Sequence, residues 1–118
     1  MPVSSLLGKT ILRAEHIDDE VKFITSDGKI FFLGHSRIGT ETVLLDKISG
    51  SLQDICEEPI IEATCEASPP RKLALVATQW TFFKIATMQG LVTISFFGET
   101  FGKEPLGVDL MEEGGFAR

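Results

Sequence analysis

Apolar and polar residues alternate with a period of two along much of the chain, which predicts a protein built mainly from β-strands. The clearest stretch is residues 80–98, where two β-rich runs flank Gln89-Gly90, a dipeptide suited to a tight hairpin turn. A two-residue loop at this dipeptide pairs Phe83 with Phe96. One face of the hairpin then gathers apolar side chains, because successive side chains of a strand point to opposite faces. These residues are Phe83, Ile85, Val92, Ile94 and Phe96.

The opposite face of this hairpin is mixed in character but still contains large apolar side chains. In the predicted register Phe82 lies opposite Phe97, and Trp80 follows on the same face. Because the other face has the better core pattern, two interpretations of these aromatic residues stay open. They form either an interface or pocket wall, or contacts with a further layer of the same chain.

Residues 20–35 predict a second hairpin, because Asp27-Gly28 is among the strongest hairpin-turn signals. A two-residue turn there pairs Phe23 with Phe32 on one face. The opposite face is also apolar, whereas a sheet covered on one side only would have a more polar outer face. Its apolar residues, which join the candidates for an interface or pocket wall, are Ile24, Phe31 and Leu33.

Shorter alternating runs predict the other elements. Strands are expected at residues 10–17, 42–48, 59–66 and 108–111. Residues 71–79 predict either a separate strand or the first part of one long strand through Trp80. Residues 51–56 suit one helical turn capped by Ser51, with Leu52 and Ile55 facing inward.

The two ends of the chain complete the predicted organisation. Residues 1–9 form an N-terminal arm or a short helix, and residues 112–118 are expected to be a flexible tail. We therefore predict a single domain, residues 1–118, with seven or eight antiparallel strands and at most two short helices. The sheet is expected to form a small sandwich or barrel.

Charge and composition exclude several classes of partner. The formal net charge is −6 and the basic residues are scattered, which disfavours a nucleic-acid partner because phosphate binding needs a Lys/Arg patch. No signal-peptide pattern and no apolar run of membrane-spanning length occur. With only two cysteines, the chain is expected to be soluble, reduced and cytoplasmic, without a membrane partner.

The residue types that most often carry chemistry are few and widely spaced. Cys56 and Cys65 are nine residues apart, and a metal site that used both with His35 would depend on tertiary convergence. Cys56 precedes Glu57-Glu58, whose charges raise a thiol pKa, so a structural, partly buried cysteine is expected. We predict no catalytic residue, no metal ligand and no cofactor. Whether the protein binds a small molecule stays open.

Several motifs together resemble an uncharacterised family of small bacterial and phage proteins. The hairpin carries the strongest part of the resemblance: residues 79–83, Thr87 with its following Gly90, residues 92–94, and Phe97-Gly98. Upstream residues occur in the same order as in that family, and they are His35, Glu41, Val43, Gly50, Leu52 and Pro59-Ile60. The resemblance spans about residues 11–110 and implies one compact domain of unknown activity.

One departure from that family limits what the resemblance implies. This chain has Gly39-Thr40 where family members carry paired cysteines, so a thiol or metal role at that pair does not transfer.

The leading hypothesis is a non-enzymatic interaction module that self-associates or binds a protein partner through an apolar hairpin face. The alternative is a small apolar-ligand-binding domain with an internal pocket between the sheets, lined by Phe and Ile.

Overall fold

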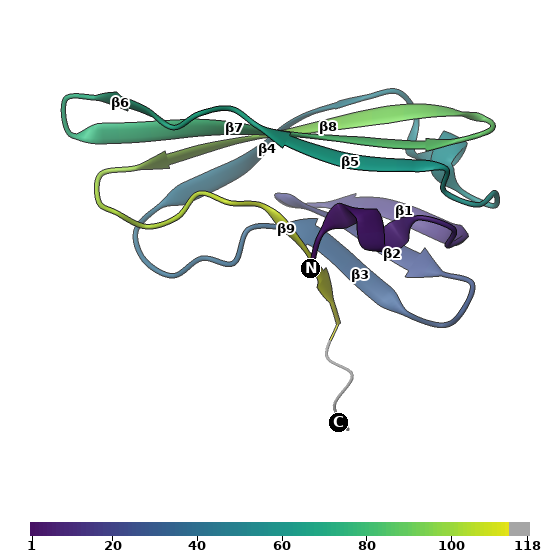
Figure 1. Cartoon of the computed structure of the whole chain (residues 1–118). Coiled ribbons are helices and arrows are strands. Elements are labelled where there is room, and N and C mark those ends of the chain that lie inside the picture. The colour runs from purple at the N-terminus through teal and green to yellow at the C-terminus, as the bar shows by residue number, and fades with distance from the viewer. Residues whose placement is uncertain (114–118) are drawn as a thin grey trace.

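Two antiparallel β-sheets face each other across an apolar core (Figure 1). The computed structural model describes residues 1–113. The four-stranded sheet has the order β1-β2-β3-β9, with β1 (Ile11–Ile17), β2 (Glu20–Thr25), β3 (Ile30–Gly34) and β9 (Asp109–Glu112). The five-stranded sheet has the order β4-β8-β7-β5, with β4 (Thr42–Ser49), β8 (Gly90–Thr100), β7 (Val76–Thr87) and β5 (Glu62–Ala67). Its fifth strand, β6 (Arg71–Leu73), pairs with β7.

The predicted mainly antiparallel fold is confirmed, and of the two architectures the structure is a sandwich rather than a closed barrel. Two short 3₁₀ turns, η1 (Val3–Leu6) and η2 (Leu52–Ile55), are the helical elements of the described residues. Ser51 caps η2 as predicted, since its hydroxyl accepts a hydrogen bond from the Gln53 N–H. The predicted tail lies outside the described residues except for Glu112 and Glu113.

The core is made by the inner faces of the two sheets. Four phenylalanine side chains that are at most 2% exposed fill its centre, and they are Phe23, Phe31, Phe83 and Phe96. Phe83 and Phe96 meet edge to face, with ring centroids 5.8 Å apart. The side chains that line a ligand-sized cavity would be partly accessible to water. The near-complete burial of these four rings therefore leaves no ligand-sized cavity among them.

The register of the β7–β8 hairpin differs from the prediction by two residues. The loop is Met88-Gln89, and Phe83 pairs with Ile94 rather than with Phe96. Gly90 belongs to β8, where a β-carbon would meet the Asp54 side chain at 3.0 Å, so this glycine permits close packing rather than the turn. Because the slip is an even number of residues, every side chain keeps its predicted face.

The register of the β2–β3 hairpin differs from the prediction by one residue, which reverses the faces of β3. The loop has three residues, 26–28, and Gly28 closes it with a φ of 82°. Phe23 therefore pairs with Phe31 rather than with Phe32. Phe31 and Leu33 lie in the core, and Phe32 lies on the outer face.

The ambiguous stretch at residues 71–79 contains both a separate strand and the start of a long one. β6 folds back on β7 through a tight turn in which Ala74 has a φ of 54°. The end of the five-stranded sheet that carries β6 extends beyond the four-stranded sheet (Figure 1). Two connections between the sheets, residues 35–41 and 101–108, run beneath this end.

Candidate functional site

The outer face of the five-stranded sheet carries a cluster of aromatic side chains. Phe97 on β8 lies opposite Trp80 on β7, whereas the predicted register placed Phe97 opposite Phe82. The ring centroids of Trp80 and Phe97 are 4.8 Å apart, and Trp80 stacks on Phe82 at 5.9 Å. Trp80 is 36% exposed and Phe82 38% exposed, so neither is covered by another layer of the described chain.

The cluster extends across the sheet to β4 on one side and to a hollow on the other. Leu44 of β4 pairs with Phe97 and is 46% exposed. We call Leu44, Trp80, Phe82 and Phe97 the outer cluster. Beyond Trp80 lies a hollow of about 510 Å³. It is bounded by Ser68, Pro69 and Arg71 and by the rings of Trp80 and Phe97.

Charged side chains border the outer cluster at the two edges of the sheet. Phe82 lies between Ser95 of β8 and Glu66 of β5, and Lys47 of β4 pairs with the same Ser95. A bulge between Leu45 and Lys47 turns Lys47 to the outer face. Both charged side chains are exposed, and neither makes an ion pair within residues 1–113. An apolar centre with a charged rim is typical of protein interfaces.

The structure separates the six residues that the sequence proposed as an interface or pocket wall. Trp80, Phe82 and Phe97 lie together on the outer face of the five-stranded sheet. Ile24 lies half-buried on the outer face of the other sheet. Phe31 and Leu33 are 2% and 0% exposed in the core, so the expectation that they share a face with Ile24 was wrong.

Sequence analysis missed Leu44 and both charged residues, Lys47 and Glu66, of this surface. Leu44 was placed on a predicted strand, but the order of the strands, which brings it beside Phe97, cannot be obtained from alternation alone. Lys47 was missed because the bulge breaks the period-two pattern at Asp46. The only local signal is the apolar character of Leu44 between polar neighbours on its own face.

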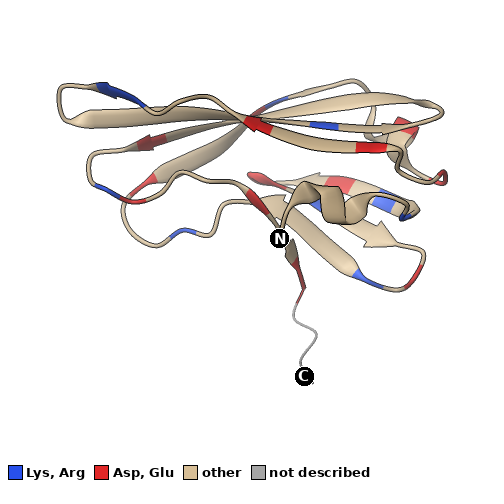
Figure 2. Ribbon diagram, in the orientation of Figure 1, with Lys and Arg blue, Asp and Glu red and all other residues tan. Residues whose placement is uncertain are grey.

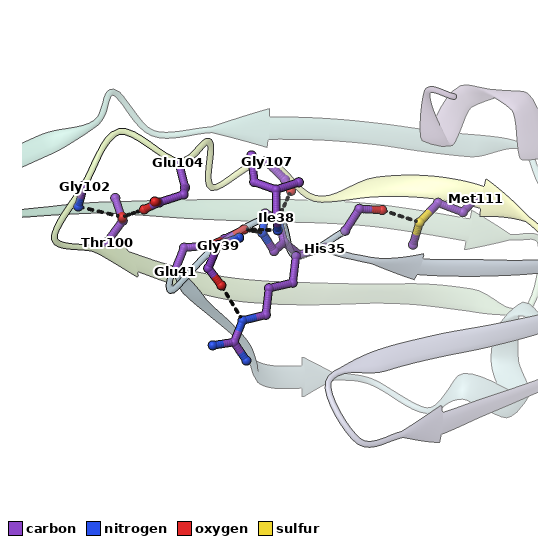
Figure 3. Close-up of polar contacts among 11 residues, drawn as sticks. His35, Ile38, Gly39, Glu41, Thr100, Gly102, Glu104, Gly107 and Met111 are labelled. Atoms are coloured by element: carbon purple, nitrogen blue, oxygen red, sulfur yellow. Dashed lines mark hydrogen bonds and ion pairs between the residues drawn. The ribbon is translucent and has the colours of Figure 1, made fainter.

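A second candidate site is the buried polar cluster around His35 and Glu41 (Figure 3). His35 Nδ1 donates to the Gly107 carbonyl oxygen at 2.7 Å, and its Nε2 lies 2.7 Å from Glu41 Oε2. The Glu41 carboxylate also accepts hydrogen bonds from the Ile38 and Gly39 N–H groups, at 2.8 and 2.7 Å. The cluster therefore ties together the two connections that pass between the sheets.

The chemistry available to this cluster is limited by its own hydrogen bonds. The Ile38 N–H holds the pKa of Glu41 down at about 2, with His35 and Gly39 adding to the effect against the opposing effect of burial. Each ring nitrogen of His35 already faces an oxygen acceptor, so neither is free to bind a metal or take a substrate proton. The cluster is suited to holding the two connections in place.

The two cysteines lie in different surroundings. Cys56 is 3% exposed, and its Sγ donates to the Leu52 carbonyl oxygen, so the predicted buried thiol is confirmed. Burial raises the pKa of Cys56, and Glu57 adds to this as expected but as a smaller cause. Cys65 is exposed on β5, and desolvation of its sulfur followed by the Asp109 charge raises its pKa.

A family model described as a domain of unknown function (DUF7448) matches residues 4–102. The chain belongs to the DUF7448 family. The match includes the outer cluster, His35 and Glu41, and it ends before β9. No curated protein and no solved structure matches the chain.

Metal-binding groups and membrane-spanning helices are both absent from the described part of the DUF7448 chain. The described part of the chain brings no three His, Cys, Asp or Glu side chains into a group that could hold a metal ion. Within residues 1–113, no helix has both the length and the apolar character needed to cross a membrane. Acidic and basic positions are interspersed over both sheets (Figure 2).

Proposed function

We propose that this protein is a non-enzymatic interaction module that self-associates through the outer face of its five-stranded sheet. The observation that carries the proposal is the outer cluster. It joins one side chain of β4, two of β7 and one of β8 into a continuous apolar surface. Large aromatic side chains of this kind dominate the binding energy of protein interfaces when they lose their contact with water.

The arrangement of the rings favours a protein partner over a flat ligand. Trp80 and Phe82 are nearly parallel, with 9° between their planes, and they stack on each other. Each ring therefore uses one of its faces within the protein. A platform for nucleobases needs ring faces that are open to the base, and the net charge of −6 also opposes a nucleic-acid strand.

The experiment that tests the proposal is light scattering of the eluting protein over a wide dilution range. We expect a dimer or larger assembly that dissociates on dilution, and we expect Trp80→Ala and Phe82→Ala to weaken it about tenfold or more. Phe32→Ala is the matched control, because Phe32 is a half-buried aromatic residue on the outer face of the other sheet. A wild-type protein that stays monomeric at every concentration would overturn the proposal.

We further propose that the protein works in the cytoplasm. Both cysteines are free, and a reduced state of two unpaired thiols is typical of that compartment.

A further inference from the structure

We infer that the occupant of the outer face is a second copy of this chain, related by a two-fold axis that runs parallel to β7 and β8 between the two strands. This inference rests on the proposed function and specifies its geometry. A two-fold interface is self-complementary, so each feature on one side of the axis must meet its complement from the other side.

The order of the strands provides the symmetry that such an axis needs. The sheet reads β4-β8-β7-β5, so a line between β8 and β7 has two strands on either side. Face-to-face rotation about this line places β8 over β7 of the second copy and β4 over β5 of the second copy. Packed sheets keep their strands within about 30° of each other, so facing rows stay close near the axis.

The row of residues through Trp80 is complementary to itself under this rotation. It contains Leu44, Phe97 and Trp80 in that order, and it ends at Ser68, whose N–H donates to the Trp80 carbonyl oxygen. Phe97 therefore meets Trp80 of the second copy. The exposed Leu44 side chain lies as far from the axis as the hollow beside Ser68 and Pro69, so it projects toward that hollow in the second copy.

The next row of residues supplies opposite charges at matching positions. It contains Lys47, Ser95, Phe82 and Glu66 in that order, with the two charged residues at its ends. Rotation brings Lys47 over Glu66 of the second copy, and the reverse contact follows from symmetry. Two ion pairs then border the aromatic centre, and both side chains lack an ion-pair partner within residues 1–113.

Two further charged residues of this face, Lys84 and Glu99, meet neutral residues in the same arrangement. Lys84 pairs with Thr93 across β7 and β8, and Glu99 pairs with Thr78, so rotation places each charge over a threonine. An axis perpendicular to the strands through the Phe82 row would instead place Lys47 over Lys47 of the second copy. Like charges that face each other oppose association, so this perpendicular axis is disfavoured, whereas the axis parallel to the strands brings opposite charges together.

Charge reversal tests this geometry directly. We expect Lys47→Glu and Glu66→Lys each to weaken self-association about tenfold, because each single change places like charges together at two symmetric positions. The double variant restores opposite charges in exchanged places, and we expect its dissociation constant to return to within about twofold of the wild type. Lys29→Glu, immediately after the β2–β3 loop, is the control for the altered net charge.

The outcomes separate this inference from the proposed function. If Trp80→Ala weakens the assembly but both charge reversals are neutral, the outer face is the interface and the two-fold geometry is wrong. Weakening in both single variants without recovery in the double variant also overturns the Lys47–Glu66 pairing. If the wild-type protein is monomeric throughout, the proposed function itself fails.

Discussion

The Glu41 carboxylate shows how strongly the surroundings of one residue can depart from what its neighbours in sequence indicate. It lies in a polar connection, where a glutamate is usually solvated, yet it is 1% exposed and accepts hydrogen bonds from two N–H groups. His35 approaches it from the end of β3, and Gly107 holds His35 from the other connection. The sequence singled out His35 and Glu41 together only through the family resemblance. It gave no sign of Gly107, because only the tertiary fold brings that residue to His35.

We predict that this carboxylate contributes to stability at neutral pH and loses its contribution in acid. Its pKa is about 2 in the folded protein and near 4.5 when it is solvated. A lowered folded pKa stabilises the protein above the solvated value, so stability falls as the pH decreases from about 4.5 to about 2. Urea unfolding at a series of pH values measures this fall.

Asp27 titrates in an overlapping range, so the acid prediction needs two variants. Hydrogen bonds from Thr25 and Lys9 lower the pKa of Asp27 to about 2. We expect Glu41→Gln to be less stable at pH 7 and to show a shallower loss in acid, and Asp27→Asn to remove a separate part of that loss. An acid profile of Glu41→Gln identical in slope to the wild type would contradict the role assigned to Glu41.

The two thiols lead to a second prediction at the scale of single residues. We expect iodoacetamide to label both cysteines more slowly in the native protein than in the denatured protein, because both pKa values are raised and the thiolate is the reactive form. Cys56 should be the slower, since it must wait for local opening. Mass spectrometry of a labelling time course measures both rates, and equal native rates would contradict the burial of Cys56.

At the scale of elements, the two hairpins show why a turn signal alone does not establish which side chains are buried. In both hairpins the glycine dipeptide marked the region of the turn, but the paired residues differed from the prediction. The two-residue slip in β7–β8 preserved the core face, whereas the one-residue slip in β2–β3 exchanged Phe31 for Phe32. Apolar residues on both faces of β3 removed the pattern that would have revealed the difference.

The exchange of faces in β3 predicts a large difference between two adjacent phenylalanines. We expect Phe31→Ala to lower the free energy of unfolding by about 3–5 kcal/mol, because it removes a fully buried ring from the core. Phe32→Ala should cost about 1 kcal/mol, since its half-buried ring makes surface contacts that include the Lys22 ammonium at 6.0 Å. Urea denaturation of the two variants under the same conditions distinguishes the two registers, and equal losses would favour neither.

At the scale of the whole molecule, sequence patterning identified the class of fold but not how the strands are ordered. Alternation located most strands, and the core faces of β2, β7 and β8 were assigned correctly. The position of β9 beside β3, and of β4 beside β8, depends on contacts between distant parts of the chain. The outer cluster spans three strands, and its β4 member, Leu44, could not be placed beside Phe97 without that order.

This arrangement predicts uneven stability across the molecule. We expect amide hydrogens in the centre of β7 and β8 to exchange only on global unfolding, because each strand there has a partner on both sides. Amides of β6 should exchange through local fraying, since this exposed three-residue strand pairs with β7 alone. Exchange followed by mass spectrometry on peptides from both regions measures the contrast, and similar protection in β6 and β8 would contradict it.

The pairing of β9 with β3 also has a consequence for how the protein is made on the ribosome. The whole five-stranded sheet is translated between these two neighbours, so the edge of β3 remains open for several seconds at about 5–20 residues per second. During that time other nascent chains can reach the backbone groups of residues 31–34. They can also reach the apolar side chains of Phe31 and Leu33, which the finished fold buries. The last described strand thus closes a nascent sheet edge that translation leaves open for longest.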